Sequence, residues 1–447
     1  GNDVFSDSQT ERSSGELLFA VKDNLFMLLS EASFVGGIEI VPVPRNATYR
    51  NEGDTENGTQ VSKQELVDFI LAKVSELSDQ VDVATAITDS DYMNDAVFSQ
   101  LDFGPLKEFL ETDDITDISY SNGGQVWLKS LTKGIYQVDR PEINNAMMEK
   151  LAFQCSNVMG KTFNMASPFL DAESAELRMN FIHESISTNG IACVIRKTPA
   201  KIRLNKDKLI NERYTTVEIH DFLIKCVEGH CNIIVSGETG SGKTELVKYL
   251  ASYTKENEKI ITIEDTLELH LDKIFPHRDI VAVKTNNIAS YSDVLVSCMR
   301  QNPKWILLSE VRSAEAVLAV RNSISSGHNI LSTIHSDKAS SIPMRMYSLM
   351  ESSQDIDQFL SSIHRYVQIG VYVKGYFSKE LNRFQREIFE VCEFYVNEKN
   401  HAKKNVIYKK FMNGKYQIQN PTKYLLDYLS IQGVVLPDDT FRLGSVN

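Results

Sequence analysis

The chain contains a complete phosphate-binding loop, and this loop constrains its fold more than any other feature. Residues 237–244 read GETGSGKT, which matches the GxxxxGK[ST] pattern. The loop follows an apolar run at 233–235 and precedes apolar residues spaced along one face of a helix. Strand, glycine loop and helix in this order predict a parallel sheet that binds a phosphorylated ligand.

Each residue type in the loop contributes to holding phosphate. Glycines let backbone N–H groups turn inward, and the N-terminus of the following helix adds a favourable dipole. The cation of Lys243 suits β- and γ-phosphates, and the hydroxyl of Thr244 can bind Mg²⁺. We therefore expect ATP and Mg²⁺ rather than a glycine-rich turn without a ligand. The expected nucleotide-binding residues are Gly237, Glu238, Thr239, Gly240, Ser241, Gly242, Lys243 and Thr244.

Length and composition limit the number of domains and the classes of function. At 447 residues with 42% hydrophobic residues, two or three domains with sizeable cores are expected. The net charge of −13 argues against a surface that coats nucleic acid. Six scattered cysteines without a CxxC pair argue against a zinc module and favour reduced thiols in the cytoplasm. We find no apolar run of 18 residues and no signal peptide, so we expect no membrane span.

The chain divides into three parts. Residues 1–100 read as a partly disordered, partly helical N-terminal extension, in which a capping box at 62–65 begins a helix through about Leu77. Residues 101–200 alternate short strands and helices, as in a smaller α+β domain. Residues 205–447 read as an α/β nucleotide-binding domain. Its C-terminal β/α tail has strands expected at 367–373 and 387–396 and a helix at 423–429.

Three predicted strands downstream of the loop end in polar side chains. The run at 260–263 is followed by Glu264 and Asp265, with Glu268 just beyond. The run at 305–308 leads to Glu310, and the run at 329–334 is followed by His335. Acids at this edge of a sheet can hold Mg²⁺ or orient a water molecule. A single acid or histidine there is often only solvated or structural. Three polar strand ends downstream of one phosphate loop favour a functional role.

These segments carry a resemblance to a known family. Residues 261–268 (ITIEDTLE), 303–312 (PKWILLSEVR) and 327–335 (GHNILSTIH) resemble the aspartate, Walker B and histidine boxes of the secretion-ATPase superfamily. Residues 104–118 and the later segments 167–171, 177–180 and 194–197 resemble its N-terminal domain. These are hexameric motors of type II and type IV secretion, type IV pili and archaeal filaments. Because the tetracysteine zinc motif of the type II branch is absent, the VirB-like or Tad/Flp-pilus branch is favoured.

The resemblance implies roles for particular residues. Glu264 would be the aspartate-box acid, Glu310 the Walker B catalytic acid and His335 the histidine-box residue, with both acids possible Mg²⁺ ligands beside Thr244. Lys243 would act on the phosphates. Arg178 and Arg196 fall in motifs whose arginines reach the γ-phosphate. Their alternative role is a surface salt bridge.

The chain departs from the family pattern at three positions. Lys304 stands where the family usually has Asp, Ser309 replaces the Gly before the Walker B acid, and Glu245 replaces a second Thr after the loop. Lys304 precedes the strand, so Glu310 can still serve. The replacements bear on catalytic activity more than on fold.

The sequence thus predicts a RecA-like P-loop ATPase domain that follows a smaller α+β domain. The resemblance implies a homo-oligomer, a hexamer, which powers a type IV secretion, conjugation or pilus-assembly machine at the cytoplasmic membrane. It would be cytoplasmic and held at the inner face of the membrane by an integral membrane platform protein, without zinc or direct nucleic-acid binding. The alternatives are a catalytically weak nucleotide-binding scaffold, a nucleic-acid translocase and a small-molecule kinase. Whether the machine moves protein, DNA or pilin is left open.

Overall fold

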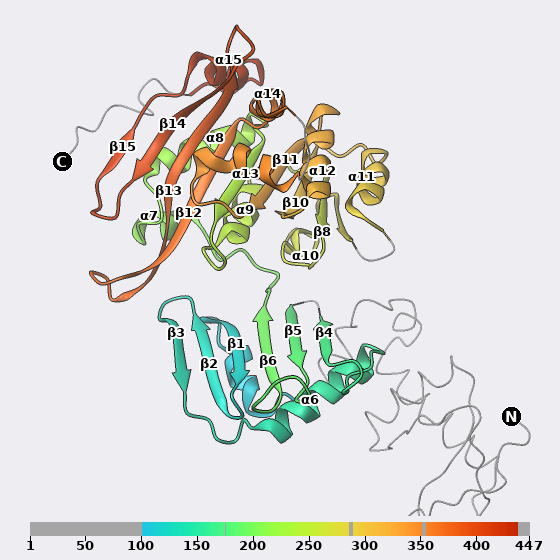
Figure 1. Cartoon of the computed structure of the whole chain (residues 1–447). Helices are drawn as coiled ribbons and strands as arrows, with labels where there is room; N and C mark the ends of the chain where they lie inside the picture. Colours follow the sequence, from blue (N-terminus) through green and yellow to red (C-terminus); the bar gives the residue numbers. More distant parts are fainter. Residues whose placement is uncertain (1–100, 175, 286–288, 351–354, 437–447) are drawn as a thin grey trace, which may run out of the picture. The chain divides into compact units, whose positions relative to one another are not determined.

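The chain folds into two compact units (Figure 1). The computed structural model describes residues 101–174, 176–285, 289–350 and 355–436. The first unit comprises residues up to Leu128 together with Tyr136–Lys197, and the second comprises Lys129–Ile135 together with residues from Thr198 onward. The N-terminal extension and the helix predicted at 62–77 lie outside the described residues.

The first unit is built on a six-stranded sheet. Its strands lie in the order β3-β2-β1-β6-β5-β4, and helix α6 covers one face. Burial alternates along the strands, so that Met179 and Phe181 of β5 point into the core while Arg178 and Asn180 point away. The elements are η1 (Gly104–Leu106), α5 (Lys107–Glu111), β1 (Ile115–Ser121), β2 (Gln125–Ser130), β3 (Gly134–Val138), α6 (Asn145–Val158), β4 (Phe169–Glu173), β5 (Leu177–Ile182) and β6 (Ala192–Lys197).

The second unit is built on a nine-stranded sheet in the order β15-β14-β13-β12-β7-β11-β10-β8-β9. The strands from β12 to β9 in this order are parallel, and β13, β14 and β15 continue the sheet in antiparallel pairs. The strands are β7 (Ile233–Gly237), β8 (Ile260–Glu264), β9 (Ile280–Lys284), β10 (Trp305–Val311), β11 (Asn329–Ile334), β12 (Ile369–Ser378), β13 (Arg383–Val396), β14 (Ala402–Lys410) and β15 (Tyr416–Ile418). The helices are α7 (Lys206–Asn211), α8 (Val217–Glu228), α9 (Lys243–Ala251), α10 (Leu271–Ile274), α11 (Tyr291–Met299), α12 (Ala314–Ser325), η2 (Ala339–Ser341), α13 (Ile342–Leu349), α14 (Ile356–Tyr366) and α15 (Lys423–Ile431).

Helices cover both faces of this sheet, and a hydrophobic core lies on each side. Ile233 and Val235 of β7 pack with α8 and α9, whereas Ile234 between them packs in the core that α11 and α12 share. Because every residue of β7 is buried, the strand reads as a continuous apolar run. The predicted α/β fold class, with a smaller α+β unit before it, is confirmed.

The C-terminal strands differ from the sequence prediction in length and placement. β12 and β13 extend to a hairpin at 379–382, because their pairing continues to Ser378 and Arg383. β12 also pairs in parallel with β7, so the predicted tail completes the nucleotide-binding sheet. Among the described residues, no helix has the length and apolar character needed to cross a bilayer.

Candidate functional site

The phosphate-binding loop connects the buried strand β7 to helix α9. Gly240 and Gly242 adopt φ values of +79° and +93°, a region where a side chain would be strained. A Cβ on Gly237 would lie 2.4 Å from the carbonyl oxygen of Val373. No side chain caps the N-terminus of α9, so its first N–H groups are left for an anion. The loop therefore has the backbone shape of a phosphate cradle.

Two side chains of the loop fit a bound polyphosphate. Lys243 is 8% exposed, and its Nζ donates to the carbonyl oxygens of Gly237 at 3.1 Å and Glu238 at 3.0 Å. The hydroxyl of Ser241 is buried and has no hydrogen-bond partner among the described residues. A buried, unpaired donor is costly unless a ligand or water completes it. ATP therefore fits this loop, and the ammonium group of Lys243 is already held over it.

An acid from the neighbouring segment reaches the start of α9. The hydroxyl of Thr244 donates to Glu268 Oε2 at 3.1 Å. A hydroxyl and a carboxylate side by side are oxygen ligands of the kind that Mg²⁺ prefers. The pair fits a Mg²⁺ site in which Thr244 and Glu268 would hold the ion, directly or through its waters.

Glu264 lies at the end of β8 but has no exposed surface. Its Oε2 accepts hydrogen bonds from the backbone N–H groups of Glu268 at 2.8 Å and Leu269 at 3.1 Å, while Oε1 has no partner among the described residues. Burial raises the pKa of Glu264 to about 7, although both backbone bonds lower it. In this structure the carboxylate holds the turn that presents Glu268 to Thr244.

Glu310 lies in β10 rather than after it. The predicted strand at 305–308 continues to Val311, and its register with β11 shifts between Leu308 and Val311. This bulge inserts one extra residue, which turns the Glu310 side chain relative to the regular strand. The side chain is directed to His335, the residue after β11, with 2.7 Å between Glu310 Oε1 and His335 Nε2.

His335 lies close to charged groups of the site. Burial, followed by the cation of Lys243, lowers the pKa of His335, and this outweighs the opposite effect of Glu310. Its Nε2 lies 2.7 Å from Glu310 Oε1, but the two atoms do not form a hydrogen bond, since Glu310 Oε1 has no hydrogen-bond partner among the described residues. The charge state of His335 therefore depends on Glu310 and Lys243, which links three of the predicted residues in one site.

Three further residues lie near these acids, and the sequence predicts a role only for Asp265, as one of the acids that follow the strand at 260–263. Asp265 forms an ion pair with Arg312, which joins the end of β8 to the end of β10. Burial raises the pKa of Tyr291 to about 12, and the charges of Glu264 and Glu310 add to the shift. The aspartate-box and Walker B segments include Asp265 and Arg312. No motif marks Tyr291, because its place depends on the packing of α11.

The other two predicted residues, Arg178 and Arg196, lie in the sheet of the first unit. They face each other across β5 and β6. Nε of Arg196 donates to Asp117 Oδ1 at 2.8 Å. The structure thus brings Lys243, Thr244, Glu310 and His335 together in the second unit and the two arginines together in the first.

Comparisons with known proteins give a family match, relatives and solved structures. The family described as Type II/IV secretion system protein matches residues 169–389. The chain is 30% identical over 319 residues to an uncharacterised protein of Bacillus anthracis, covering 69% of this chain and 70% of that protein. It is 36% identical over 144 residues to the type IV secretion system protein VirB11 of Bartonella quintana, covering 32% of this chain and 40% of VirB11.

A solved structure shares the fold. The ATPase DotB of Yersinia pseudotuberculosis aligns with a TM-score of 0.50 at 17% identity, covering 68% of this chain and 80% of DotB. At that identity the similarity concerns the fold alone.

Proposed function

The chain belongs to the type II/IV secretion system protein family, and from this premise we propose that it is an ATPase motor of a secretion or pilus machine. The family resemblance of the sequence is thereby confirmed. The observation that carries the proposal is the convergence of four groups at the carboxyl ends of adjacent parallel strands. The four groups are the cradle at 237–244, the Thr244–Glu268 pair, the side chain of Glu310 and the side chain of His335. Ligands of open α/β sheets bind at this edge.

Nucleotide binding begins with Lys243. Its ammonium group exchanges the carbonyl oxygens of Gly237 and Glu238 for the β- and γ-phosphates, which are stronger partners because they are charged. Backbone N–H groups of the loop and of the first turn of α9 complete the contacts. Mg²⁺ beside Thr244 and Glu268 would neutralise phosphate charge.

Glu310 positions the attacking water. Its Oε1 lies 2.7 Å from His335 Nε2 and has no hydrogen-bond partner among the described residues, so this oxygen can accept a hydrogen bond from water in line with the γ-phosphate. The water oxygen forms a bond to Pγ as the bond from Pγ to the bridging oxygen breaks. That oxygen leaves with ADP, and the water proton passes through Glu310 to solvent.

Arg178 and Arg196 are proposed to stabilise the charge on the transferring phosphoryl group. Guanidinium groups at this position act mainly in the transition state, where the negative charge is spread over three oxygens. We propose that these arginines are engaged by ATP and released after hydrolysis. That cycle would produce motion that a membrane partner can use.

We further propose that the chain assembles into a hexameric ring, which an integral membrane platform protein holds at the cytoplasmic membrane. Subunits that share nucleotide sites in a ring would couple their hydrolysis cycles, and a closed ring has no free interface. Support comes from the family membership and from the similarity to VirB11, a protein of type IV secretion. The cargo of the machine is not part of the proposal.

A steady-state phosphate-release assay with the full chain, MgATP and added single- or double-stranded nucleic acid tests this function. We expect turnover that nucleic acid does not change. Binding of ATP without phosphate release would identify a scaffold. Strong stimulation by DNA or RNA would identify a translocase.

A further inference from the structure

A fully buried lysine lies on the phosphate-loop helix, and the nucleotide chemistry does not account for it. Lys248 of α9 is 1% exposed. Its Nζ donates to the carbonyl oxygen of Pro199 at 3.2 Å and lies 3.4 Å from Glu245 Oε1. A buried ammonium group is tolerated only where it is paired and hydrogen-bonded. Its partners therefore indicate what the side chain holds in place.

Both partners connect Lys248 to the linker, which we define as residues 198–204 between β6 and α7. Pro199 belongs to it, and Glu245 Oε2 accepts a long hydrogen bond of 3.4 Å from the backbone N–H of Arg203. These contacts all lie within the second unit.

The linker is packed as well as hydrogen-bonded. Ile202 and Leu204 lie against the core shared by α8 and α9. Glu245, which stands where the family usually has a second Thr, thus contacts the linker through one oxygen and Lys248 through the other. The residue that departs from the family pattern here, Glu245, is therefore one that contacts the linker.

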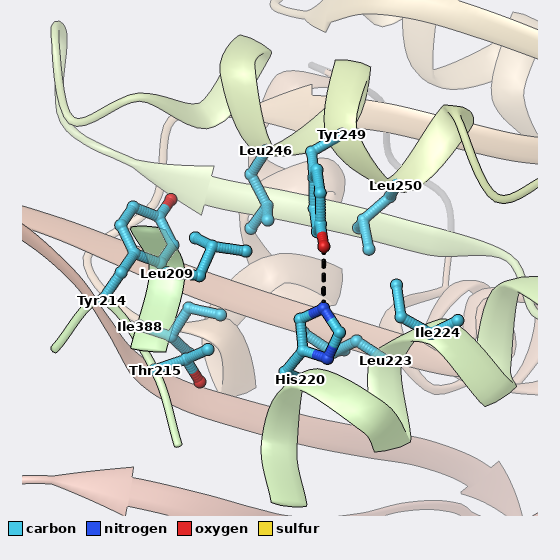
Figure 2. Close-up of a pocket in the computed structure, with 10 residues that line it drawn as sticks. All are labelled: Leu209, Tyr214, Thr215, His220, Leu223, Ile224, Leu246, Tyr249, Leu250 and Ile388. Atoms are coloured by element: carbon cyan, nitrogen blue, oxygen red, sulfur yellow. Dashed lines mark hydrogen bonds between the residues drawn. The ribbon is translucent and has the colours of Figure 1, made fainter. Parts of the chain in front are cut away.

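The same helix that holds the linker presents the nucleotide-binding groups. Glu245 directly follows Thr244, and Lys248 lies one turn further on the same side of α9. Tyr249, four residues after Glu245, contacts α8, because His220 Nε2 and Tyr249 Oη lie 2.8 Å apart (Figure 2). The cavity beside this contact measures about 10 Å³, room for no more than one water, so it is not a ligand site.

We propose that Glu245 and Lys248 are positioning residues that couple nucleotide binding at the start of α9 to the conformation of the linker. Bound nucleotide shifts or stiffens the first turn of α9. This change passes along one helical turn to Lys248 and reaches the linker through the hydrogen bond from Lys248 Nζ to the carbonyl oxygen of Pro199. The linker joins the arginine-bearing unit to the ATPase unit in the chain. This inference rests on the proposed function only in requiring that the loop binds nucleotide.

Hydrogen–deuterium exchange of the full chain tests the coupling. It is measured without nucleotide, with MgADP and with the magnesium complex of a non-hydrolysable ATP analogue. In the wild type, we expect the analogue to slow exchange at the amides of 198 and 200–204 about tenfold, which corresponds to about 1.4 kcal/mol of added local stability. In Lys248→Met, which keeps most of the side-chain volume, residues 237–244 should still be protected by nucleotide, but the linker should not.

Lys225→Met is the matched control. Lys225 pairs with Glu228 on α8 at the same spacing, with 2.7 Å between the charged atoms. This variant should keep the protection of the linker. If Lys248→Met does not fold, Glu245→Gln replaces it, and the nucleotide-dependent protection should be reduced because its amide pairs more weakly with Lys248.

The outcomes separate this inference from the proposed function. Protection of 237–244 without any change in the wild-type linker would overturn the coupling while leaving nucleotide binding intact. Full linker protection in the folded Lys248→Met variant would also overturn it. Absence of protection at 237–244 would overturn nucleotide binding and the coupling together.

Discussion

Arg178 and Arg196 lie directly opposite each other on neighbouring antiparallel strands of the first unit. Like charges in opposite positions destabilise a strand pair. The same row continues to an acid on each side, because Glu173 is opposite Arg178 and Asp117 is opposite Arg196. The row is therefore neutral as a whole, with two guanidinium groups at its centre. Such a pair suits a multiply charged anion, and the flanking acids offset part of the repulsion between the two guanidinium groups.

The first prediction follows from this pair. If the two side chains contact the γ-phosphate, Arg178→Ala or Arg196→Ala should lower the rate of ATP hydrolysis by about 100-fold or more. Affinity for ADP should stay within about threefold, because ADP lacks the group that they contact. Phosphate release and ADP titration by calorimetry measure the two quantities. Equal losses of ADP and ATP affinity without a change in rate would assign the arginines to a salt bridge.

Asp117→Asn is the matched control for Arg196. It removes the ion pair and keeps the guanidinium group. A half-exposed pair of this kind contributes only about 0.2–1 kcal/mol to stability. We expect the variant to fold normally and to hydrolyse ATP within a few-fold of the wild-type rate. A loss of hydrolysis rate as large as that in Arg196→Ala would show that the rate depends on the Asp117–Arg196 ion pair rather than on the guanidinium group alone.

Glu310 should separate binding from turnover. Glu310→Gln keeps the size of the side chain and removes the acceptor charge that positions water, so we expect MgATP affinity near the wild-type value and turnover slower by about 100- to 1,000-fold. A binding isotherm is measured beside a rate on the same preparation. If affinity falls as far as the rate, Glu310 is chiefly a structural or metal-binding residue.

Glu264 should make the protein less stable as pH rises. Its pKa is about 7 in the folded chain, above its ordinary value of 4.5. Between these values the folded state holds a proton that the unfolded state has lost, so the free energy of unfolding falls as pH rises through this window. Urea denaturation without nucleotide at pH 5 and pH 8 should show this loss, on the order of 1–3 kcal/mol, in the wild type.

The Glu264→Gln variant tests the origin of that pH dependence. An amide has no charge to lose, so its stability should fall less between pH 5 and pH 8 than that of the wild type. The same pH dependence in both proteins would place the titrating group elsewhere.

Ring assembly should depend on nucleotide. A ligand that binds across neighbouring subunits stabilises the assembly by mass action, so an ATP analogue with Mg²⁺ should shift the chain towards one defined oligomer. Light scattering at micromolar protein should give a mass near six chains that does not grow with concentration. A monomeric mass over the whole range would remove the ring and favour the kinase-like alternative.

The strands that carry the site could be predicted from the sequence because they are buried on both faces. The runs beginning at Ile233, Ile260, Trp305 and Asn329 are short and mostly apolar, and the structure has a buried strand at each. The length of β10 could not be predicted, because a bulge carries its pairing past the polar residues that mark a strand end. The edge strand β9 was missed as well.

The environment of each site residue depended on tertiary contacts. Acids at strand ends are usually solvated, and the burial of Glu264 arises only because the backbone at Glu268 and Leu269 folds back over it. The pairing of Arg178 with Arg196 is a matter of strand register, which their separation in the sequence does not reveal. The loop at 237–244 needed no such information, since its glycine pattern specifies its shape.

The most direct test of the central claim is phosphate release from MgATP by the wild type and by Lys243→Ala. The substitution removes the cation that stabilises charge on the transferring phosphoryl group, and circular dichroism checks that the variant is folded. We predict measurable turnover in the wild type and a reduction of about 100-fold or more in the folded variant. Equal turnover in the two proteins would contradict the assignment of ATP hydrolysis to this site.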